Sequence, residues 1–492
     1  MIKKLLAVSA ALLLIMTLIP FSVEATPKSN AVSPDWPDGT FHGTWHNRTA
    51  SGSLQGTIDQ GRRDTLGTFT ADWTNNATTG HVTGFFCGSL FLGRWEGANQ
   101  SSLLVGHVAT NATGFTGLLI LQGHGLVRIT GQYQASFLPA LTGPYHIGVQ
   151  SIPLVDPNRP EYFTADPTDV REFMVQLWYP RDPNASGPQD PYMDPLTFLW
   201  LKNQSPVPLI TIPDTAYRFV HPHGQLNSQV AAGLHPVLVF SPGYDGVYQI
   251  YTSLIEDLAS HGFVVAAINH PYVSGITVFP DGHTVDIATP PTDPVERAAF
   301  MNMSLRTIIG DAKFTLDFLT TLNATNSTFG GTLDLGRVGM LGHSFGGANT
   351  AVCCLEDARF KAGLTLDGYF DTGFLNGTIS QPFLLMVQEA RFANDSNTMF
   401  VWNHTTGDVF KVGITGSTHY AFTDVGTLLS HLVPLIPPRL LGFGTIAPKR
   451  MVNVTRAYEV TFFEVYLDGR PVQDLIDLSA TFPEVMVDYR LA

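Results

Sequence analysis

The segment Arg337–Gly347, which reads RVGMLGHSFGG, decides the fold of this chain. A short apolar run leads into Gly-x-Ser-x-Gly, and small residues suited to a helix follow at Ala348–Leu355. A serine on a tight turn between a strand and a helix needs glycine on both sides, because larger side chains would clash there. The pattern predicts Ser344 as a nucleophile. It also places the Phe345 N–H at a helix N-terminus, where it can bind a developing oxyanion.

Apolar runs and helical patterns alternate on both sides of this segment. The predicted strands are Phe173–Tyr179, Pro236–Phe240, Phe263–Ile268, Gly363–Leu366, Pro382–Val387 and Val409–Ile414. The predicted helices are Ile250–Ser260, Met301–Leu322 and a final helix at Val454–Leu467, and 181–213 is predicted to be an irregular insertion. Continuous apolar strands that alternate with helices indicate a mostly parallel sheet with both faces covered. Residues 140–492 are therefore predicted to form an α/β-hydrolase fold.

The sequence upstream of residue 140 has a different composition, rich in glycine, threonine and aromatic residues. Seven short segments recur at Phe41–Trp45, Ser53–Ile58, Leu66–Trp73, Val82–Trp95, Leu103–Val108, Phe115–Leu121 and Leu126–Tyr133. Several of them alternate, so that Phe69, Ala71 and Trp73 share one face. Residues 39–138 are therefore predicted to be a small antiparallel β domain, either a barrel or a sandwich, and no catalytic group is predicted in it.

The N-terminal residues carry the pattern of a signal peptide. Two lysines precede the apolar run Leu5–Ile19, and Val23-Glu24-Ala25 suits a cleavage site, so 1–25 is predicted to direct secretion or cell-surface display. An uncleaved anchor is the alternative. Residues 26–38, with three prolines, are predicted to be a linker.

Composition narrows the range of partners. The net charge of −14 argues against nucleic acid as a partner.

The three cysteines make no disulfide framework, and Cys353 and Cys354 are predicted to be buried on the helix after Ser344. The apolar stretch Leu428–Phe443 predicts an acyl pocket or a lid that contacts a membrane or lipid surface, with core packing as the alternative.

A serine nucleophile needs a histidine base and a carboxylate that orients it, in the chain order Ser, acid, His. The loop GSTH, which ends at His419, follows the last predicted strand, so His419 is the predicted base among 16 histidines. His404 and His431 are the alternatives. Ser241-Pro242-Gly243-Tyr244 follows an early strand, so the Tyr244 N–H is the predicted second oxyanion donor.

The position of the acid stays open when it is judged from the sequence pattern alone. Asp367 ends the strand that follows the nucleophile unit, whereas Glu389 ends the next strand, with Asp395 close behind. Asp371 is a further candidate. The carboxylates that do not orient the base would serve as helix caps or salt-bridge partners.

Several of these stretches together resemble one known family. FSPGY at 240–244, LASHGFVVAA at 258–267, GHSFGG at 342–347, LDG at 366–368 and GSTH at 416–419 are similar to the platelet-activating-factor acetylhydrolases of the plasma, lipoprotein-associated type. The resemblance runs from about Gly143 to Leu467. It implies a calcium-independent serine esterase without cofactors. It also implies Ser344 as nucleophile, Asp367 as acid, His419 as base, and Tyr244 and Phe345 as amide donors.

One departure from this family bears on the substrate. Pro242 stands where the plasma-type proteins carry a histidine, and Ser241–Tyr244 also resembles cutinases and polyester hydrolases. The expected substrates are short-chain or oxidised phospholipid acyl esters or simple acyl esters, with a cutinase-like esterase as the alternative. A surface-binding protein with an inactive hydrolase domain is the competing hypothesis from another class.

Overall fold

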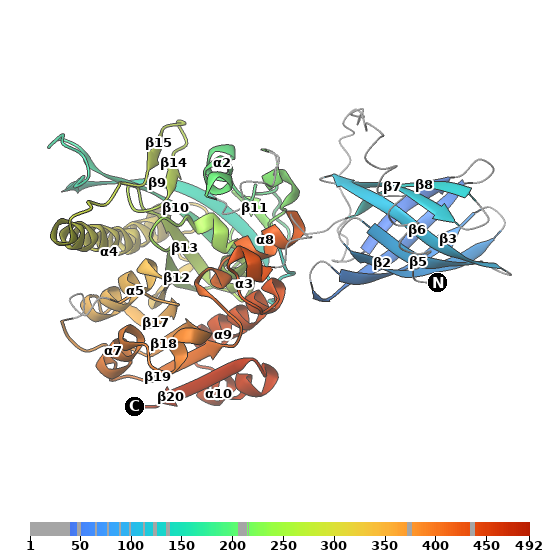
Figure 1. Cartoon of the computed structure of the whole chain (residues 1–492). Helices are drawn as coiled ribbons and strands as arrows, with labels where there is room; N and C mark the ends of the chain where they lie inside the picture. Colours follow the sequence, from blue (N-terminus) through green and yellow to red (C-terminus); the bar gives the residue numbers. More distant parts are fainter. Residues whose placement is uncertain are drawn as a thin grey trace. The chain divides into compact units, whose positions relative to one another are not determined.

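The computed structural model of the chain is drawn in Figure 1. It describes residues 40–492 apart from 47–50, 64–65, 76–77, 88–89, 98–99, 112–113, 122–124, 134–137, 205–213, 215, 371–375 and 433–437. The predicted signal peptide and linker lie outside the described residues. None of the described helices combines the length and the apolar character that a membrane crossing requires.

The first part of the described chain is an antiparallel sheet that closes on itself. Its strands are β1 (Thr40–His46), β2 (Ser51–Arg63), β3 (Leu66–Thr74), β4 (Thr79–Cys87), β5 (Leu90–Gly97), β6 (Gln100–Asn111), β7 (Gly114–Leu121) and β8 (Gly125–Tyr133). Each strand pairs with the next, and β8 pairs back onto β1, with Trp45 opposite Ile129. Because the sheet closes on itself, this part is a barrel, and the predicted alternative of a sandwich is wrong. The prediction of one segment at Val82–Trp95 is wrong, because that stretch contributes to two strands, β4 and β5.

The interior of this closed sheet is apolar. Phe69, Ala71 and Trp73 are all buried, as their alternation predicts. The indole rings of Trp73 and Trp95 stack with their centroids 4.1 Å apart, and Trp45 meets Trp73 edge-on at 5.8 Å. The large aromatic side chains on one face of the strands therefore pack against one another inside the sheet.

The rest of the chain is built on a second sheet of ten strands, ordered β11-β9-β10-β13-β12-β16-β17-β18-β19-β20. The bounds are β9 (His146–Pro160), β10 (Val170–Arg181), β11 (Gly224–Leu226), β12 (His235–Ser241), β13 (Val264–Asn269), β16 (Leu333–His343), β17 (Phe360–Leu366), β18 (Phe383–Gln388), β19 (Val409–Ile414) and β20 (Val485–Arg490). Pairing is parallel from β13 through β19 and antiparallel at β9–β10, β10–β13 and β19–β20. The predicted α/β-hydrolase type of fold, preceded by an all-β sheet, is confirmed.

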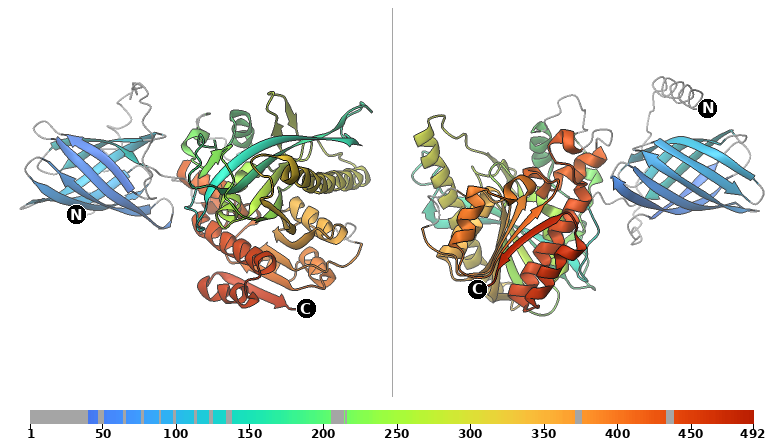
Figure 2. Two further views of the ribbon diagram at one scale, coloured as in Figure 1. Left: turned by 180° about the vertical axis from the view of Figure 1, so that it is seen from behind. Right: turned by 60° about the horizontal axis from the view of Figure 1, so that its bottom comes forward.

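Helices cover both faces of the ten-stranded sheet (Figures 1 and 2). The principal ones are α3 (Thr252–Ser260), α4 (Pro294–Thr325), α5 (Phe345–Glu356) and α9 (Pro448–Asp468). The shorter ones are α2 (Pro195–Asn203), α6 (Glu389–Phe392), α7 (Ser396–His404), α8 (Val425–Leu432) and α10 (Val472–Thr481). The 3₁₀ turns are η1 (Ala216–Phe219), η2 (Tyr248–Tyr251), η3 (His419–Phe422) and η4 (Pro438–Leu441), and β14 (Ile276–Val278) pairs with β15 (Thr284–Asp286).

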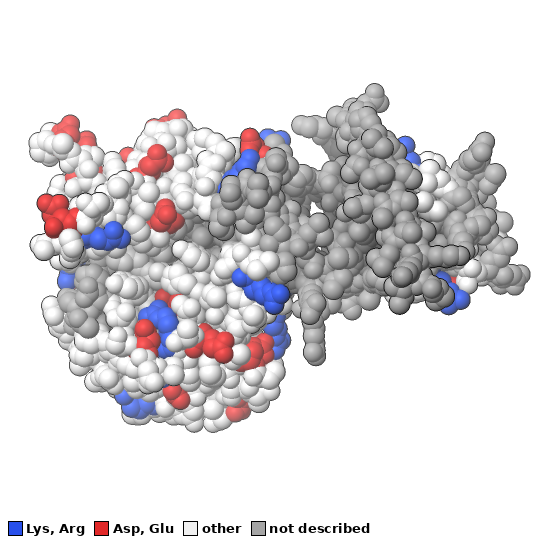
Figure 3. Space-filling view, viewed as in Figure 1, with Lys and Arg blue, Asp and Glu red and all other residues white. Residues whose placement is uncertain are grey.

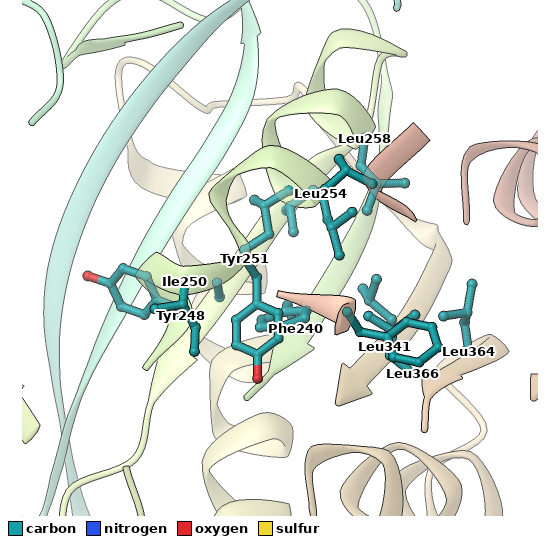
Figure 4. Packing of buried hydrophobic residues seen from close by; sticks show 14 of the residues in the cluster. Phe240, Tyr248, Ile250, Tyr251, Leu254, Leu258, Leu341, Leu364 and Leu366 are labelled. Carbon is teal, nitrogen blue, oxygen red and sulfur yellow. The ribbon is translucent and has the colours of Figure 1, made fainter. Parts of the chain in front are cut away.

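Two hydrophobic cores lie on opposite faces of the sheet. Leu238 and Phe240 of β12 pack toward α3 and α9, as Figure 4 shows for Phe240, whereas Val237 and Val239 pack toward α4 and α5. Successive side chains of a strand point to opposite faces, so a strand buried on both faces is apolar throughout. This is why the central strands could be located from their continuous apolar runs.

The structure corrects two predictions about elements and adds a strand that was not predicted. The helix at Val454–Leu467 is part of α9 but is not the last, because α10 and the edge strand β20 follow. The stretch 181–213 contains a helix, α2, whose first turn is capped by Asp194. Strand β9 was not predicted, because most of its residues beyond Val149 alternate between buried and exposed and leave no continuous apolar run.

The stretch Leu428–Phe443 packs largely into the core, and 433–437 lies outside the described residues. Leu428, Leu429, Leu441 and Phe443 are buried, whereas Leu440 is 71% exposed. Core packing therefore accounts for most of this stretch, and a lid stays a prediction. Cys353 and Cys354 are buried, as predicted.

Charged side chains are sparse on the face of the molecule drawn in Figure 3. Lys and Arg there lie singly or beside Asp and Glu, separated by broad areas of uncharged residues. This described part of the surface offers no basic patch to a polyanion.

Candidate active site

Ser344 occupies the turn between β16 and α5. Its backbone has φ 52° and ψ −113°, a strained conformation that non-glycine residues rarely adopt outside functional sites. A Cβ added to Gly342 would lie 2.3 Å from the carbonyl oxygen of Gly346, and one added to Gly346 would lie 2.0 Å from that of Ser241. Both glycines are therefore required by close backbone packing, as the sequence pattern predicts.

The structure brings Ser344, His419 and Asp367 together from the carboxyl ends of β16, β19 and β17. His419 Nε2 lies 3.0 Å from Ser344 Oγ, and His419 Nδ1 lies 2.6 Å from Asp367 Oδ2. The His419 side chain is 32% exposed, whereas that of Asp367 is fully buried. A carboxylate can only accept, so Nδ1 carries the proton of the neutral ring and Nε2 is free to accept from the serine hydroxyl.

Asp367 is held as a carboxylate by several donors. Burial opposes its ionisation, but the hydrogen bond from His419 and the charge of Arg391 outweigh burial and lower the pKa of Asp367. Gln388 donates to Asp367 from its backbone and from its side-chain amide, at 3.1 and 2.7 Å. Arg391 donates to Asp367 Oδ1 at 3.2 Å and to Asp395 at 2.7 Å. Sequence reasoning missed Gln388 and Arg391, because no motif marks them.

The other candidate acids and bases have different contacts. Glu389 accepts from the Gly416 N–H at 2.7 Å, so it holds the loop that leads to His419. Asp395 caps α7 and pairs with Arg391. His404 donates to the carbonyl of Phe400, at 2.8 Å. Asp371 and the side chain of His431 lie outside the described residues.

The two predicted oxyanion donors lie on segments that meet at Ser344. A Cβ added to Gly243 would lie 3.2 Å from Ser344 Cβ, so the loop after β12 passes directly beside Ser344. The rings of Tyr244 and Phe345 are in edge-on contact at 5.8 Å. Within the described part of the chain, no protein acceptor engages the N–H of Tyr244 or of Phe345. Both groups stay available to a ligand.

A buried hydrogen-bond chain that the sequence analysis missed joins these loops. The hydroxyl of Tyr251 lies 2.9 Å from His343 Nδ1, and His343 Nε2 lies 3.0 Å from the carbonyl oxygen of His419. The backbone of Gly243 hydrogen-bonds to the same Tyr251 hydroxyl. Burial, then the nearby charge of His419, lowers the pKa of His343 to about 3. A neutral His343 thus donates to His419 and accepts from Tyr251, whose ring lies beside Phe240 (Figure 4).

Comparison with known proteins places this arrangement in a family. The family model described as "Platelet-activating factor acetylhydrolase, isoform II" matches residues 130–284 and 304–475, more than half of the chain. The chain belongs to this family. The predicted resemblance is thereby confirmed. The match to the acetylhydrolase family starts at residue 130, so nearly all of the closed sheet β1–β8 lies outside it.

Individual relatives are distant esterases. A probable 1-alkyl-2-acetylglycerophosphocholine esterase of Arthroderma benhamiae is 27% identical over 51% of this chain, which spans 65% of that relative's length. The cutinase est1 of Thermobifida alba is 26% identical over 45% of this chain and 62% of its own length. The solved structure of a ferulic acid esterase from Streptomyces cinnamoneus is 28% identical, with a TM-score of 0.59, and the match covers 71% of this chain and 98% of that one.

The segment after His419 in this acetylhydrolase-family chain is anchored by a buried acid, Asp424. Its backbone N–H donates to the carbonyl of Ile250 at 2.7 Å, and its Oδ2 accepts from the Ser253 N–H at 3.0 Å. Its Oδ1 is buried without a partner among the described residues. Burial is the main cause that raises the pKa of Asp424 to about 7.

This raised pKa predicts that Asp424→Asn stabilises the protein in a pH-dependent way. An aspartate in the unfolded chain has a pKa of about 4, and Asp424 in the folded chain has one of about 7. Between these values the folded state holds a proton that the unfolded state has released, so stability falls as the pH rises. We expect the gain in unfolding free energy from Asp424→Asn to be about 1–3 kcal/mol larger at pH 8 than at pH 4.

Urea unfolding at pH 4, 6 and 8 measures this gain. The exposed Asp477 on α10 supplies the matched control, and Asp477→Asn should show no comparable growth with pH. A stability difference for Asp424→Asn that stays constant over this range would contradict the prediction.

Proposed function

We propose that this chain is a serine esterase that hydrolyses carboxylic esters through Ser344, His419 and Asp367. One observation carries the proposal: the His419 ring bridges the Ser344 hydroxyl, at 3.0 Å, and the buried Asp367 carboxylate, at 2.6 Å. A base in this position can take the hydroxyl proton as the serine attacks, and the carboxylate stabilises the imidazolium that forms.

The first step forms an acyl-enzyme. Ser344 Oγ attacks the acyl carbon, His419 Nε2 takes the serine proton, and the carbonyl oxygen becomes an oxyanion. The N–H groups of Tyr244 and Phe345 stabilise that oxyanion; loss of one such donor costs on the order of 3 kcal/mol of barrier. His419 then passes the proton to the leaving alcohol as the tetrahedral intermediate collapses.

The second step releases the acyl group. Water loses a proton to His419 Nε2 and attacks the acyl carbon, and the same N–H groups bind the second oxyanion. Collapse of this intermediate returns the proton from His419 to Ser344 Oγ and frees the carboxylic acid. The mechanism uses no calcium, metal or organic cofactor.

The relatives support two substrate classes. The names of the family and of the fungal relative refer to acetyl esters of a glycerophosphocholine, which favours short-chain or oxidised phospholipid acyl esters or simple acyl esters. The cutinase and the ferulic acid esterase favour a cutinase-like or polyester-hydrolase-like esterase as the second candidate. The proposed enzyme is secreted or displayed at the cell surface, as the signal-peptide pattern of residues 1–25 predicts.

Initial rates of the full chain test both points. We expect hydrolysis of p-nitrophenyl acetate that is unchanged by a chelator such as EDTA. A series of acyl-chain lengths, offered as phospholipid, simple ester and polyester, then separates the two substrate classes. A folded chain that hydrolyses none of these esters would refute the proposal and favour a surface-binding protein with an inactive hydrolase domain.

The buried His343 predicts a further effect on this reaction. In His343→Leu the Tyr251 hydroxyl and the His419 carbonyl lose a shared partner, so the base is less firmly positioned. We expect kcat for p-nitrophenyl acetate to fall about 10- to 100-fold, the usual range for groups that orient a reacting residue. His235 is a similarly buried histidine at the start of β12, and each of its ring nitrogens lies 3.0 Å from a carbonyl oxygen. Equal kcat losses in His343→Leu and His235→Leu would contradict this role.

A further inference from the structure

A second serine, histidine and aspartate form a hydrogen-bonded row in the core of the acetylhydrolase-family region. Ser241 Oγ lies 3.0 Å from His270 Nε2, and His270 Nδ1 lies 2.8 Å from Asp311 Oδ2. Ser241 ends β12, His270 follows β13, and Asp311 lies on α4. The order of atoms is the same as in Ser344, His419 and Asp367.

This second set differs from the first in its access to solvent. Ser241, His270 and Asp311 are 0%, 1% and 0% exposed. The Ser241 hydroxyl also accepts from the side-chain amide of Asn349, at 3.2 Å. A substrate ester has no path to a hydroxyl in this position, so the set cannot act as a second nucleophilic site.

The hydrogen bonds of this set have a single consistent direction. Burial lowers the pKa of His270, so its ring is neutral. Burial opposes ionisation of Asp311, but the charge of Arg171 and the hydrogen bonds from His270 and Arg171 together outweigh burial and lower the pKa of Asp311. The Asp311 carboxylate therefore accepts from His270 Nδ1, and Nε2 accepts from the Ser241 hydroxyl. Every polar atom in the row is paired, which rigidifies such a network.

The network is anchored in strands outside the loop that carries Tyr244. Arg171 on β10 donates to Asp311 at 3.1 and 2.7 Å and to the carbonyl of Pro271 at 3.2 Å. Arg159 donates to Asp311 at 2.5 Å. Arg171 thus holds both Asp311 and Pro271, the residue that follows His270.

The loop that carries Tyr244 is attached to this network on both sides. On one side Ser241 is bonded to His270, and on the other the Asp245 N–H donates to the carbonyl of Val273, at 3.0 Å. His270 and Val273 belong to one tight turn, since the Val273 N–H donates to the His270 carbonyl at 3.0 Å. Tyr244 lies between two attachment points on a single rigid turn.

We propose that Ser241, His270 and Asp311 are positioning residues that hold the Tyr244 N–H in place as an oxyanion donor. This inference rests on the proposed esterase function and deepens it. A donor contributes most when it is already aimed at the position of the oxyanion, so freeing the loop weakens transition-state binding more than ester binding. The predicted signature is therefore a loss in kcat with little change in KM.

Ser241→Ala in the full chain is the first test, because it removes one hydroxyl and adds no bulk. We expect kcat for p-nitrophenyl acetate to fall about 10-fold, with KM changed less than about two-fold. A trifluoromethyl ketone forms a tetrahedral alkoxide adduct with the serine, so its inhibition constant should rise by a factor close to the loss in kcat. Ser304 on α4 is equally buried, with its hydroxyl bonded to the Phe300 carbonyl, and Ser304→Ala should leave both constants unchanged.

His270→Gln and the double variant keep the inference testable if one change perturbs folding. Both single changes break the same attachment, so the double variant should lose no more kcat than the worse single one. Folded Ser241→Ala or His270→Gln with wild-type kcat and inhibitor affinity would overturn the inference, even with a lower melting temperature. Full activity in both variants would leave the proposed function intact, whereas an inactive wild-type chain would refute that function and this inference together.

Discussion

Ser344→Ala is expected to lower kcat/KM for p-nitrophenyl acetate by roughly 10⁴- to 10⁶-fold, to the level that the remaining oxyanion donors and binding can support. The hydroxyl that lies 3.0 Å from His419 Nε2 is removed, and no other hydroxyl among the described residues forms a hydrogen bond with that nitrogen. The variant should keep its fold, because alanine fits the turn between Gly342 and Gly346 as well as serine does. The positive φ at position 344 strains both residues alike.

Covalent labelling measures the same prediction directly. A fluorophosphonate should label the wild-type chain at one site and leave Ser344→Ala unlabelled. Ser304→Ala is the internal control, because that serine is buried on α4 away from the site and its loss should leave the labelling unchanged. Equal labelling of the wild type and Ser344→Ala, or a label mapped to another serine, would remove Ser344 from the mechanism.

Asp367→Asn is expected to give the second largest loss, about 10³- to 10⁴-fold in kcat, because an amide can donate to His419 Nδ1 and favour the wrong ring tautomer. The effect should be concentrated in kcat, since the Asp367 side chain is fully buried beneath His419 and has no exposed surface for substrate. Steady-state kinetics with p-nitrophenyl acetate, together with circular dichroism to check folding, measures it.

Glu389→Gln supplies the comparison that decides between the two acids. Glu389 accepts from the Gly416 N–H, and a glutamine oxygen can accept from the same group, so we expect less than about a ten-fold loss. A loss of kcat in Glu389→Gln as large as in Asp367→Asn would contradict the assignment of Asp367 as the carboxylate that orients His419.

Strand and helix types could be read from local pattern. The strands β12, β13, β16, β18 and β19 are continuous apolar runs because both of their faces are covered, and such runs are visible without any partner. Strands at or next to an edge of the sheet, such as β20 and β9, have one face or end in solvent, so their apolar residues alternate or become sparse and the local signal is lost. The same limit explains why α10 and β20 were not expected after α9.

The sequence by itself predicted Ser344 and His419 as nucleophile and base, and it determined the close approach of Gly342 and Gly346, because a strained turn between a strand and a helix leaves a recognisable spacing of glycines around its serine. The sequence pattern left the acid open and the family resemblance implied Asp367. The tertiary structure brings Asp367 rather than Glu389 to His419, although both residues follow parallel strands, because Glu389 instead accepts from the Gly416 N–H. Only the tertiary structure revealed that the buried Ser241 has the same hydrogen-bond geometry to a histidine as Ser344, because the three residues of that second set come from distant parts of the sequence and carry no motif.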